Sequence, residues 1–251
     1  MSGTTPQGIE GERQISLWVR DMFGKVAPRY DLLNHLLSLN IDRLWRNRTV
    51  QLVQPILDRP GAVAVDLCCG TGDLTIALQR GASAATILGS DFCHPMLRTA
   101  KEKMTERRLP SPLFEADALR LPLRDSSVDL LTVAFGFRNL ANYEAGLLEM
   151  RRVLRPEGVA AILEFSQPPN KLFASFYNFY SMRVLPKIAG VVSGAPDAYT
   201  YLPESVRKFP GAEGLAHKME QAGFRNVTFD RMTFGVVALH RGQVTRQTGR
   251  A

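Results

Sequence analysis

The sequence has no run of apolar residues close to the roughly 20 that a membrane-spanning helix requires. Its first residues, MSGTTPQGIEGERQ, lack the apolar core of a secretory signal, so we expect a cytosolic protein. Cysteine is scarce as well: the chain contains only Cys68, Cys69 and Cys93, and none of them forms a C-x-x-C pair. This scarcity argues against a disulfide framework and against a metal site, so we expect neither.

Acidic residues are in the minority, because 24 Asp and Glu face 31 Lys and Arg, which gives a net charge of +7. The excess favours a polyanionic partner, either nucleic acid or an anionic membrane surface, and charge alone does not choose between them. A solvated surface with a basic bias explains the excess equally well. The arginines form small clusters: Arg43, Arg46 and Arg48; Arg107 and Arg108; and Arg151 and Arg152.

Short apolar, β-prone runs alternate with helical segments, which is typical of a mostly parallel sheet with crossover helices. A proline and a glycine in 155–158 should end the last of these helices. Two runs near the C-terminus are separated only by Phe234 and Gly235, so we expect an antiparallel hairpin. The pattern predicts an α/β fold with an open, doubly wound sheet. The expected strands are 62–69, 86–92, 113–118, 128–136, 158–166, 226–233 and 236–242, and the expected crossover helices are 73–80, a segment from His94, and 141–154.

The chain length predicts a single domain, 1–251, because 251 residues with 45% hydrophobic content bury one full core. Two segments lie outside the alternation, one largely helical and one rich in aromatic residues. We divide the domain into an N-terminal helical extension (15–58), a ligand-binding core (59–166), an insert on the substrate side (167–211), and a last helix with the hairpin (212–242).

The turn after the first expected strand has the sequence VDLCCGTGD (65–73). It lies at the carboxyl end of a strand, where open α/β sheets bind ligands. It is not a Walker loop, since no Lys-Ser or Lys-Thr follows its second glycine, and Thr75 occupies the third-glycine position of a dinucleotide motif. Asp66 and Asp73 would repel a pyrophosphate. The turn therefore favours a ligand with positive charge and no phosphate.

S-adenosylmethionine is such a ligand, with an ammonium group, a sulfonium and two free ribose hydroxyls. Asp91 ends the second expected strand, 21 residues after Gly70, where a carboxylate can accept two hydrogen bonds from a ribose. Asp117 ends the third, beside the small Ala118, and can accept from an adenine amino group. Tight turns and helix caps explain each residue alone, but not why all gather at one edge of the sheet. We therefore predict S-adenosylmethionine as the cofactor.

Several segments resemble the UbiE/MenG quinone C-methyltransferases: VDLCCGTGD, SDFCHPML, EADALRLPLRDSSVDLLTVAFGFRNL, RVLRPEG, LEFSQP, DAYTYLPESVRKFP and GVVALHRG. The resemblance runs from about Phe23 to Gly242. The first motif is shared by most class I methyltransferases, whereas FGFRN, AYTYLPESV and VVALHRG are more specific to this family. The resemblance implies a class I S-adenosylmethionine-dependent methyltransferase fold. It also implies methyl transfer to a ring carbon of a prenylated quinol, most often demethylmenaquinol to menaquinol.

The resemblance also implies cofactor positions in this chain. These are Thr71, Asp91, Asp117 and Ala118, and the turn itself adds Asp66, Gly70 and Gly72. Ala134 departs from the family, because many members have a serine before the FG pair, and a hydroxyl contact to the cofactor is lost there.

Carbon methylation requires an electron-rich ring, which the loss of a proton from one quinol hydroxyl supplies. An ordinary phenol has a pKa of about 10, so the enzyme must lower it or place a base nearby. Arg138 and Asn139 follow the fourth strand. We expect Arg138 to stabilise the developing phenolate or orient a water, and Asn139 to hold the second hydroxyl or the cofactor. The alternative is a surface arginine paired with a carboxylate such as Glu164.

Aromatic residues in the 167–211 segment bear on the substrate. Tyr199 and Tyr201 are candidates for substrate contacts, with ordinary packing as the alternative. LFASFYNFYSMRVLPKI places Phe176 and Tyr180 on an aromatic face at helical spacing, which is either core or an apolar groove for a prenyl tail. With the basic surface, this suggests transient contact with an anionic membrane and a peripheral position on it.

Other functions remain open. An RNA or DNA methyltransferase would suit the charge, but amino-group methyltransferases carry an Asn/Asp-Pro-Pro-aromatic turn where this chain has FGFRN, so we expect no nucleic acid. A non-catalytic scaffold would predict a damaged turn, and VDLCCGTGD is intact. A benzoquinol precursor of ubiquinone and a phytyl-naphthoquinol remain alternative substrates, and the oligomeric state is open.

Overall fold

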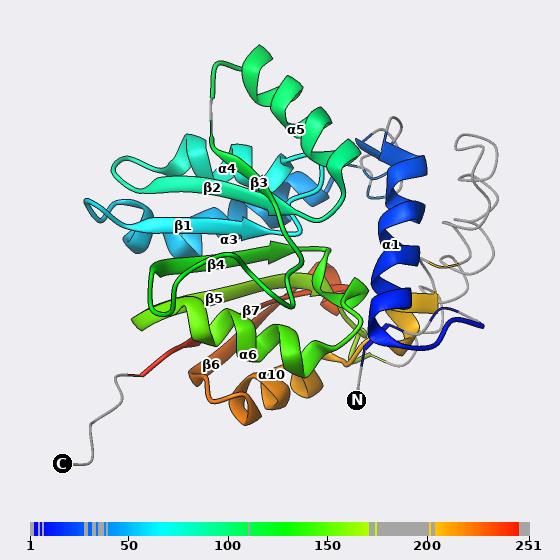
Figure 1. The fold of residues 1–251 in the computed structure, drawn as a ribbon. Helices are drawn as coiled ribbons and strands as arrows, with labels where there is room; N and C mark the ends of the chain where they lie inside the picture. Colours follow the sequence, from blue (N-terminus) through cyan, green and yellow to red (C-terminus); the bar gives the residue numbers. More distant parts are fainter. Residues whose placement is uncertain are drawn as a thin grey trace.

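The structure is a computed structural model of the 251-residue chain (Figure 1). It describes residues 3, 4, 6, 8–27, 30, 31, 34, 38, 40–109, 111–170, 174, 201 and 204–245. Among these residues, no helix is long and apolar enough to cross a membrane.

A seven-stranded sheet forms the centre, with strand order β3-β2-β1-β4-β5-β7-β6. The first five strands are parallel, β7 is antiparallel to β5, and β6 pairs antiparallel with β7 at the edge. This confirms the predicted doubly wound, mostly parallel sheet with its C-terminal hairpin. The strands are β1 (Val63–Leu67), β2 (Thr86–Asp91), β3 (Leu113–Glu115), β4 (Val128–Ala134), β5 (Leu154–Phe165), β6 (Arg225–Met232) and β7 (Val237–Gln243).

Helices cover both faces of the sheet. On one face, α3 and α4 pack on β1, β4 and β5 through Trp45, Leu57 and Leu74. On the other, α6 and α10 pack through Leu147 and Leu215. The helices are α1 (Glu12–Val26), α3 (Asp42–Leu57), α4 (Asp73–Gly81), α5 (His94–Glu106), α6 (Tyr143–Val153) and α10 (Ala212–Gln221), with short 3-10 turns η2 (Phe137–Asn139) and η4 (Thr233–Gly235).

Local sequence explains where these elements form. β4 is VDLLTVA and is buried along nearly its whole length, as a central parallel strand covered on both faces must be. The helix α6 begins after Asn142, whose side chain accepts a hydrogen bond from the Ala145 N–H (3.0 Å). The strand β2 ends at Asp91, as predicted.

Two boundaries differ from the prediction. The helix α6 ends at Val153 and β5 begins immediately at Leu154, so the proline and glycine of 155–158 lie inside a strand. The strand accommodates them with a register shift and a left-handed Glu157 (φ 67°), whose N–H donates to the Val244 carbonyl. The strand β3 is also short, so Asp117 lies two residues beyond its end, in an isolated bridge with Arg120.

The N-terminal extension reaches the carboxyl edge of the sheet. In Figure 1, α1 (blue) stands across the ends of the central strands rather than against a face. The main chain of Thr4 continues this contact, because its N–H donates to the Leu140 carbonyl (2.9 Å) beyond η2. The division of the domain into 15–58, 59–166, 167–211 and 212–242 stays a prediction.

Candidate active site

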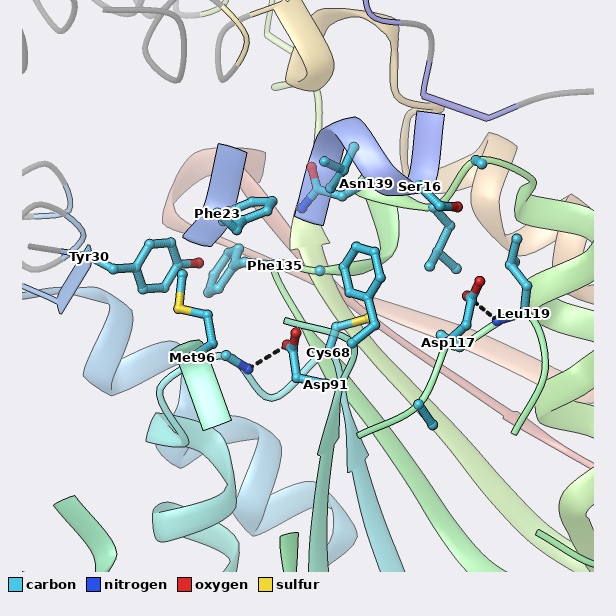
Figure 2. Close-up of a pocket in the computed structure, with 18 residues that line it drawn as sticks. Ser16, Phe23, Tyr30, Cys68, Asp91, Met96, Asp117, Leu119, Phe135 and Asn139 are labelled. Carbon is cyan, nitrogen blue, oxygen red and sulfur yellow. Dashed lines mark hydrogen bonds between the residues drawn. The ribbon is translucent and has the colours of Figure 1, made fainter. Parts of the chain in front are cut away.

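A cavity opens at the carboxyl edge of the sheet, between the ends of β1, β2 and β4 and helix α1 (Figure 2). It measures about 650 Å³ when the open space at its mouth is counted. A smaller cavity of about 360 Å³ adjoins it and shares Tyr30, Cys68, Gly70 and Phe135. Among the residues that line the larger cavity are the polar Asp91, Asp117 and Asn139 and the apolar Val19, Phe23, Met96, Leu140 and Ala141.

The turn between β1 and α4 is left-handed at Cys68 (φ 51°), Gly70 (φ 55°) and Gly72 (φ 84°). Gly70 lines both cavities, and its N–H donates to Asp91 Oδ2 (2.8 Å). Gly72 serves packing, since a Cβ there would lie 2.8 Å from the Met104 side chain of α5. The two glycines, both predicted to bind the cofactor, therefore have different surroundings.

Asp91 and Asp117 lie in the larger cavity, as their strand positions predicted. Asp91 accepts the N–H groups of Gly70 and Cys93 (2.8 and 2.9 Å), one on each carboxylate oxygen. Each oxygen keeps a further lone pair for a ligand hydroxyl. Asp117 is exposed and accepts the Leu119 N–H (2.9 Å), and its neighbour Ala118 also lines the cavity.

Asp66 lies beneath the turn in the smaller cavity. Its carboxylate accepts hydrogen bonds from the hydroxyls of Thr75 (2.7 Å) and Thr132 (2.8 Å), and it is only 1% exposed. Thr71 lines the same cavity, but its hydroxyl donates to Asp31 of the N-terminal extension. The hydroxyl of Thr71 therefore ties the turn to that extension.

Burial changes the acidity of the two carboxyls beneath the site. It raises the pKa of Asp66 and that of Asp91 to about 6, although hydrogen bonds from hydroxyls and backbone N–H groups partly oppose the rise. Such carboxyls are costly to bury in the charged form. A ligand cation beside them would offset that cost.

Arg46 was missed as a site residue, because the sequence pattern placed it in a basic surface cluster. It is 9% exposed, lines the smaller cavity and pairs with Asp42 one helical turn earlier on α3. Its guanidinium also lies 3.8 Å from Asp73 and over the Phe135 ring, 5.7 Å from the centroid. The Asp42 and Arg46 spacing was the available signal, since such a pair on one helix face can be buried together.

Tyr30 was missed as well. It lines both cavities and packs edge-on against Phe23, with ring centroids 5.9 Å apart. Phe135 also lines both cavities, and Figure 2 draws both residues among the lining side chains. A single tyrosine in the N-terminal extension carries no local pattern, so only the tertiary contact identifies it.

Lys103 links the extension to the turn. Its ammonium lies 2.6 Å from Asp31 and 2.6 Å from Asp73, and it is largely buried. One cation from α5 thus bridges a carboxylate of the N-terminal extension and one at the start of α4. The bridge holds residues 30 and 31 over the turn between β1 and α4.

The turn after β4 positions Arg138 and Asn139. Phe135 is left-handed (φ 58°), and a Cβ on Gly136 would lie 2.4 Å from that of Cys68. The FG pair therefore brings this turn against the end of β1. Asn139 lines the larger cavity, as Figure 2 shows.

Arg138 points away from that cavity into the protein. Its guanidinium pairs with Glu164 (3.0 Å), donates to the Phe135 carbonyl and lies over the Phe165 ring. The pairing with Glu164 was the alternative interpretation, but the arginine is buried rather than on the surface, since its side chain is 5% exposed. Arg138 Nε is buried and has no hydrogen-bond partner in the part of the chain that the structure describes.

The predicted substrate contacts have different outcomes. Tyr201 is buried, and its hydroxyl donates to Asn139 Oδ1 (3.0 Å), so it contacts the cavity wall rather than forming it. Tyr199, Phe176 and Tyr180 lie outside the described residues. His94, at the start of α5, is exposed and lies 3.0 Å from Glu115.

Sequence comparison relates the chain to known proteins. A family model described as the ubiE/COQ5 methyltransferase family matches residues 9–244. A demethylmenaquinone methyltransferase from Thermus thermophilus is 48% identical over 221 residues, which cover 88% of this chain and 99% of that protein. The ubiquinone/menaquinone biosynthesis C-methyltransferase UbiE of Shewanella pealeana is 37% identical over 238 residues, 93% of each protein.

Structure comparison agrees on the fold. The crystal structure of an S-adenosylmethionine-dependent methyltransferase from Thermotoga maritima, a possible histamine N-methyltransferase, aligns with a TM-score of 0.63 and 17% identity. The alignment covers 90% of this chain and 99% of that one. At this identity the likeness shows the fold alone, and it confirms the predicted class I methyltransferase fold.

The raised pKa of Asp66 predicts how stability depends on pH. The folded pKa of about 6 lies above the ordinary 3.8, so folding favours the protonated form. At low pH the protonated Asp66 carboxyl therefore stabilises the folded state, and this stabilisation is lost as the pH rises through 6. Between pH 5 and pH 8, the free energy of unfolding of the native chain should fall by about 1.4 kcal/mol more than that of Asp66→Asn, measured by denaturant unfolding. An equal pH response in both proteins would contradict this assignment.

Proposed function

Because this chain belongs to the ubiE/COQ5 methyltransferase family, we propose that it transfers a methyl group from S-adenosylmethionine to a ring carbon of demethylmenaquinol, which yields menaquinol. The observation that carries this proposal is the 48% identity, over 88% of the chain, to a protein named demethylmenaquinone methyltransferase. A second protein of that name, from Deinococcus radiodurans, is 46% identical. Relatives named for both quinones, among them proteins 37% and 41% identical, support a benzoquinol precursor as the alternative substrate.

The residues of the two cavities fit S-adenosylmethionine. Asp91 offers two carboxylate oxygens to a ribose, and Asp117 lies beside the small Ala118, where an adenine edge can be accommodated. Cys68 and Phe135 join the two cavities, so a ligand can extend from one into the other. When bound, S-adenosylmethionine supplies a methyl group on a positively charged sulfur.

The smaller cavity suits the amino-acid end of the cofactor. It holds the Arg46 cation together with the carboxylates of Asp66 and Asp73, so it offers a partner to each charge of a zwitterion. Arg46 is the residue we assign to the carboxylate, because its guanidinium is buried and held over the Phe135 ring. Asp66 is assigned to the ammonium, since it lines this cavity, its pKa is raised by burial, and a ligand cation beside it would favour its charged form.

The larger cavity suits a quinol ring and the start of an apolar tail. Val19 and Phe23 of α1 line it together with Leu140 and Ala141, which gives the ring and tail an apolar surface. Asn139 is the amide on this wall and can donate a hydrogen bond to a quinol oxygen. Because the oxygen gains negative charge as its proton leaves, an amide donor stabilises the phenolate more than the quinol.

Arg138 has an indirect role in this scheme. Its guanidinium pairs with the Glu164 carboxylate outside the cavity. The net charge of the pair is therefore near zero. The arginine Nε is buried without a hydrogen-bond partner among the described residues and can hold a water molecule, which supports the proposal that Arg138 orients a water. We keep Arg138 and Asn139 as the proposed catalytic pair on this basis.

Membrane contact is part of the proposal, because a prenylated quinol resides in a bilayer. The large apolar side chains of Leu44 on α3 (66%) and Phe234 on η4 (79%) are strongly exposed at the carboxyl edge. A hydrogen bond from the Trp45 indole to Thr233 (2.8 Å) joins these two elements. The exposed Arg43 and Arg48 flank Leu44 on α3 and can contact anionic lipid headgroups.

The substrate is tested by methyl transfer from labelled S-adenosylmethionine. The acceptors are reduced demethylmenaquinone, the same quinone left oxidised, a demethylated benzoquinol, a phytyl-naphthoquinol and bulk tRNA. We expect label in the reduced quinones alone and the fastest transfer to demethylmenaquinol, because only the quinol can form a phenolate. Label in the tRNA, equal transfer to the oxidised quinone, or no transfer would contradict the proposal.

The cofactor assignment is tested by calorimetry with two ligands that differ at the amino-acid end. S-adenosylhomocysteine carries the carboxylate and ammonium, and 5′-methylthioadenosine carries neither. Arg46→Gln should weaken S-adenosylhomocysteine roughly 10- to 100-fold, as loss of a charge-assisted hydrogen bond does, and leave methylthioadenosine nearly unchanged. Arg59→Gln is the matched control at the opposite edge of the sheet, where Arg59 pairs with Asp129. An equal loss for both ligands would refute the assignment.

The membrane contact is tested by sedimentation with phosphatidylglycerol vesicles and with phosphatidylcholine vesicles. We expect binding to the anionic vesicles that weakens with added salt. The double variant Leu44→Ser and Phe234→Ser should bind several-fold less. Leu148→Ser is the control, because Leu148 is also exposed (53%) but lies on α6. If this control loses as much binding as the double variant, the contact surface is elsewhere.

A further inference from the structure

We infer that Tyr201 is a positioning residue that holds the amide of Asn139 in one orientation, with its donor end toward the substrate. The inference deepens the proposed function and rests on it, since it assigns a role to a residue that does not line the cavity. Tyr201 donates to Asn139 Oδ1 (3.0 Å) and lies 2.7 Å from Thr4 Oγ1. Three segments far apart in the chain thus meet behind one wall of the cavity.

The direction of these hydrogen bonds follows from the number of protons. The Tyr201 hydroxyl has one proton, and this proton lies on the bond to the Asn139 carbonyl oxygen, which can only accept. The hydrogen bond between Thr4 and Tyr201 must therefore be donated by Thr4. The result is a one-way chain from Thr4 through Tyr201 to Asn139.

The placement of Asn139 Oδ1 against Tyr201 leaves the other end of the amide for the substrate. The Oδ1 atom of Asn139 is engaged by Tyr201, so the amide nitrogen is the end that remains for the cavity. Figure 2 agrees, because the nitrogen of Asn139 points toward Phe135 and the oxygen points the opposite way. An amide turned by half a rotation would present an acceptor, which would repel a developing phenolate instead of stabilising it.

The surroundings of Tyr201 keep it in place. Its side chain is 7% exposed, and its ring meets Trp18 of α1 edge-on, with centroids 5.2 Å apart. Thr4 is 4% exposed, and its N–H is fixed on the Leu140 carbonyl, the residue after Asn139. Burial raises the pKa of Tyr201, so its hydroxyl stays a donor throughout the physiological pH range. A buried hydrogen bond of this kind is costly to leave unmade, which keeps the Asn139 amide against Tyr201.

The kinetic test compares single variants with variants in an Asn139→Ala background. Tyr201→Phe removes only the hydroxyl, and we expect kcat to fall about 10-fold, with the KM for S-adenosylmethionine nearly unchanged. Thr4→Val removes the first donor of the hydrogen-bond chain. It should also lower kcat, but by less than Tyr201→Phe does. In Asn139→Ala, Tyr201→Phe should cause no further loss, because the group that it orients is absent.

Tyr143→Phe is the matched control. The Tyr143 hydroxyl donates to the Arg138 carbonyl (3.0 Å) and supports the same turn without contacting the Asn139 amide. Its effect on kcat should be the same in the native and the Asn139→Ala backgrounds. If Tyr201→Phe also behaves additively, Tyr201 supports the turn as a whole and the positioning role is wrong.

A second measurement decides the inference without any substrate. The side-chain amide signals of Asn139 in a ¹⁵N-labelled protein are identified by their loss in Asn139→Ala. Tyr201→Phe should shift or broaden them, whereas Tyr143→Phe should leave them close to their native positions. Unchanged signals in Tyr201→Phe would overturn the inference even if the enzyme methylates quinols. A clear shift would support it even if the quinol assay failed, so the two proposals can fail separately.

Discussion

The buried ion pair between Arg138 and Glu164 is the constraint on which the geometry of the site depends. It joins the turn after β4 to the end of β5, and Glu164 also accepts the backbone N–H groups of Arg138 and Phe165. Two desolvated charges are stable there because they pair with each other and with main-chain groups, although Arg138 Nε has no partner among the described residues. Removing one partner would leave the other charged and buried, at a cost of about 3–5 kcal/mol. The pair therefore fixes the turn that carries Asn139 into the cavity.

The walls of the cavity come from segments that are distant in the sequence. The parallel strands supply Gly70 and Asp91 at one edge, as strand polarity requires. The opposite wall comes from α1 and from Tyr30, which Lys103 and Asp31 hold over the turn. A ligand in the cavity is therefore covered by the N-terminal extension. Such a cover excludes water, which strengthens every hydrogen bond made to a developing charge.

Charge at the site is arranged at some cost to the fold. Asp66 and Asp91 are buried with a pKa raised to about 6, and Arg46 is buried among carboxylates. None of these groups is needed by an apolar core, and each would be replaced by a hydrophobic residue if stability alone mattered. In the proposed binding mode, Arg46 pairs with the carboxylate of the ligand, Asp66 with its ammonium, and Asp91 accepts from its ribose hydroxyls. Burying these charged groups lowers the stability of the protein without ligand, and a bound cofactor that pairs with them can restore it.

The sequence by itself determined the order of strands and helices, because apolar runs and helical periodicity are local properties. It also placed Gly70 and Asp91 at the same edge, since the carboxyl ends of parallel strands meet there. Only the tertiary structure decided where the side chains point: it turned Arg138 onto Glu164, brought Arg46 to the smaller cavity and set Tyr201 behind Asn139. These contacts join segments separated by tens of residues. Local spacing indicates at most that Arg46 can pair with Asp42 on one helix face, because the contacts themselves follow from how buried helices, strands and ion pairs fill one common core.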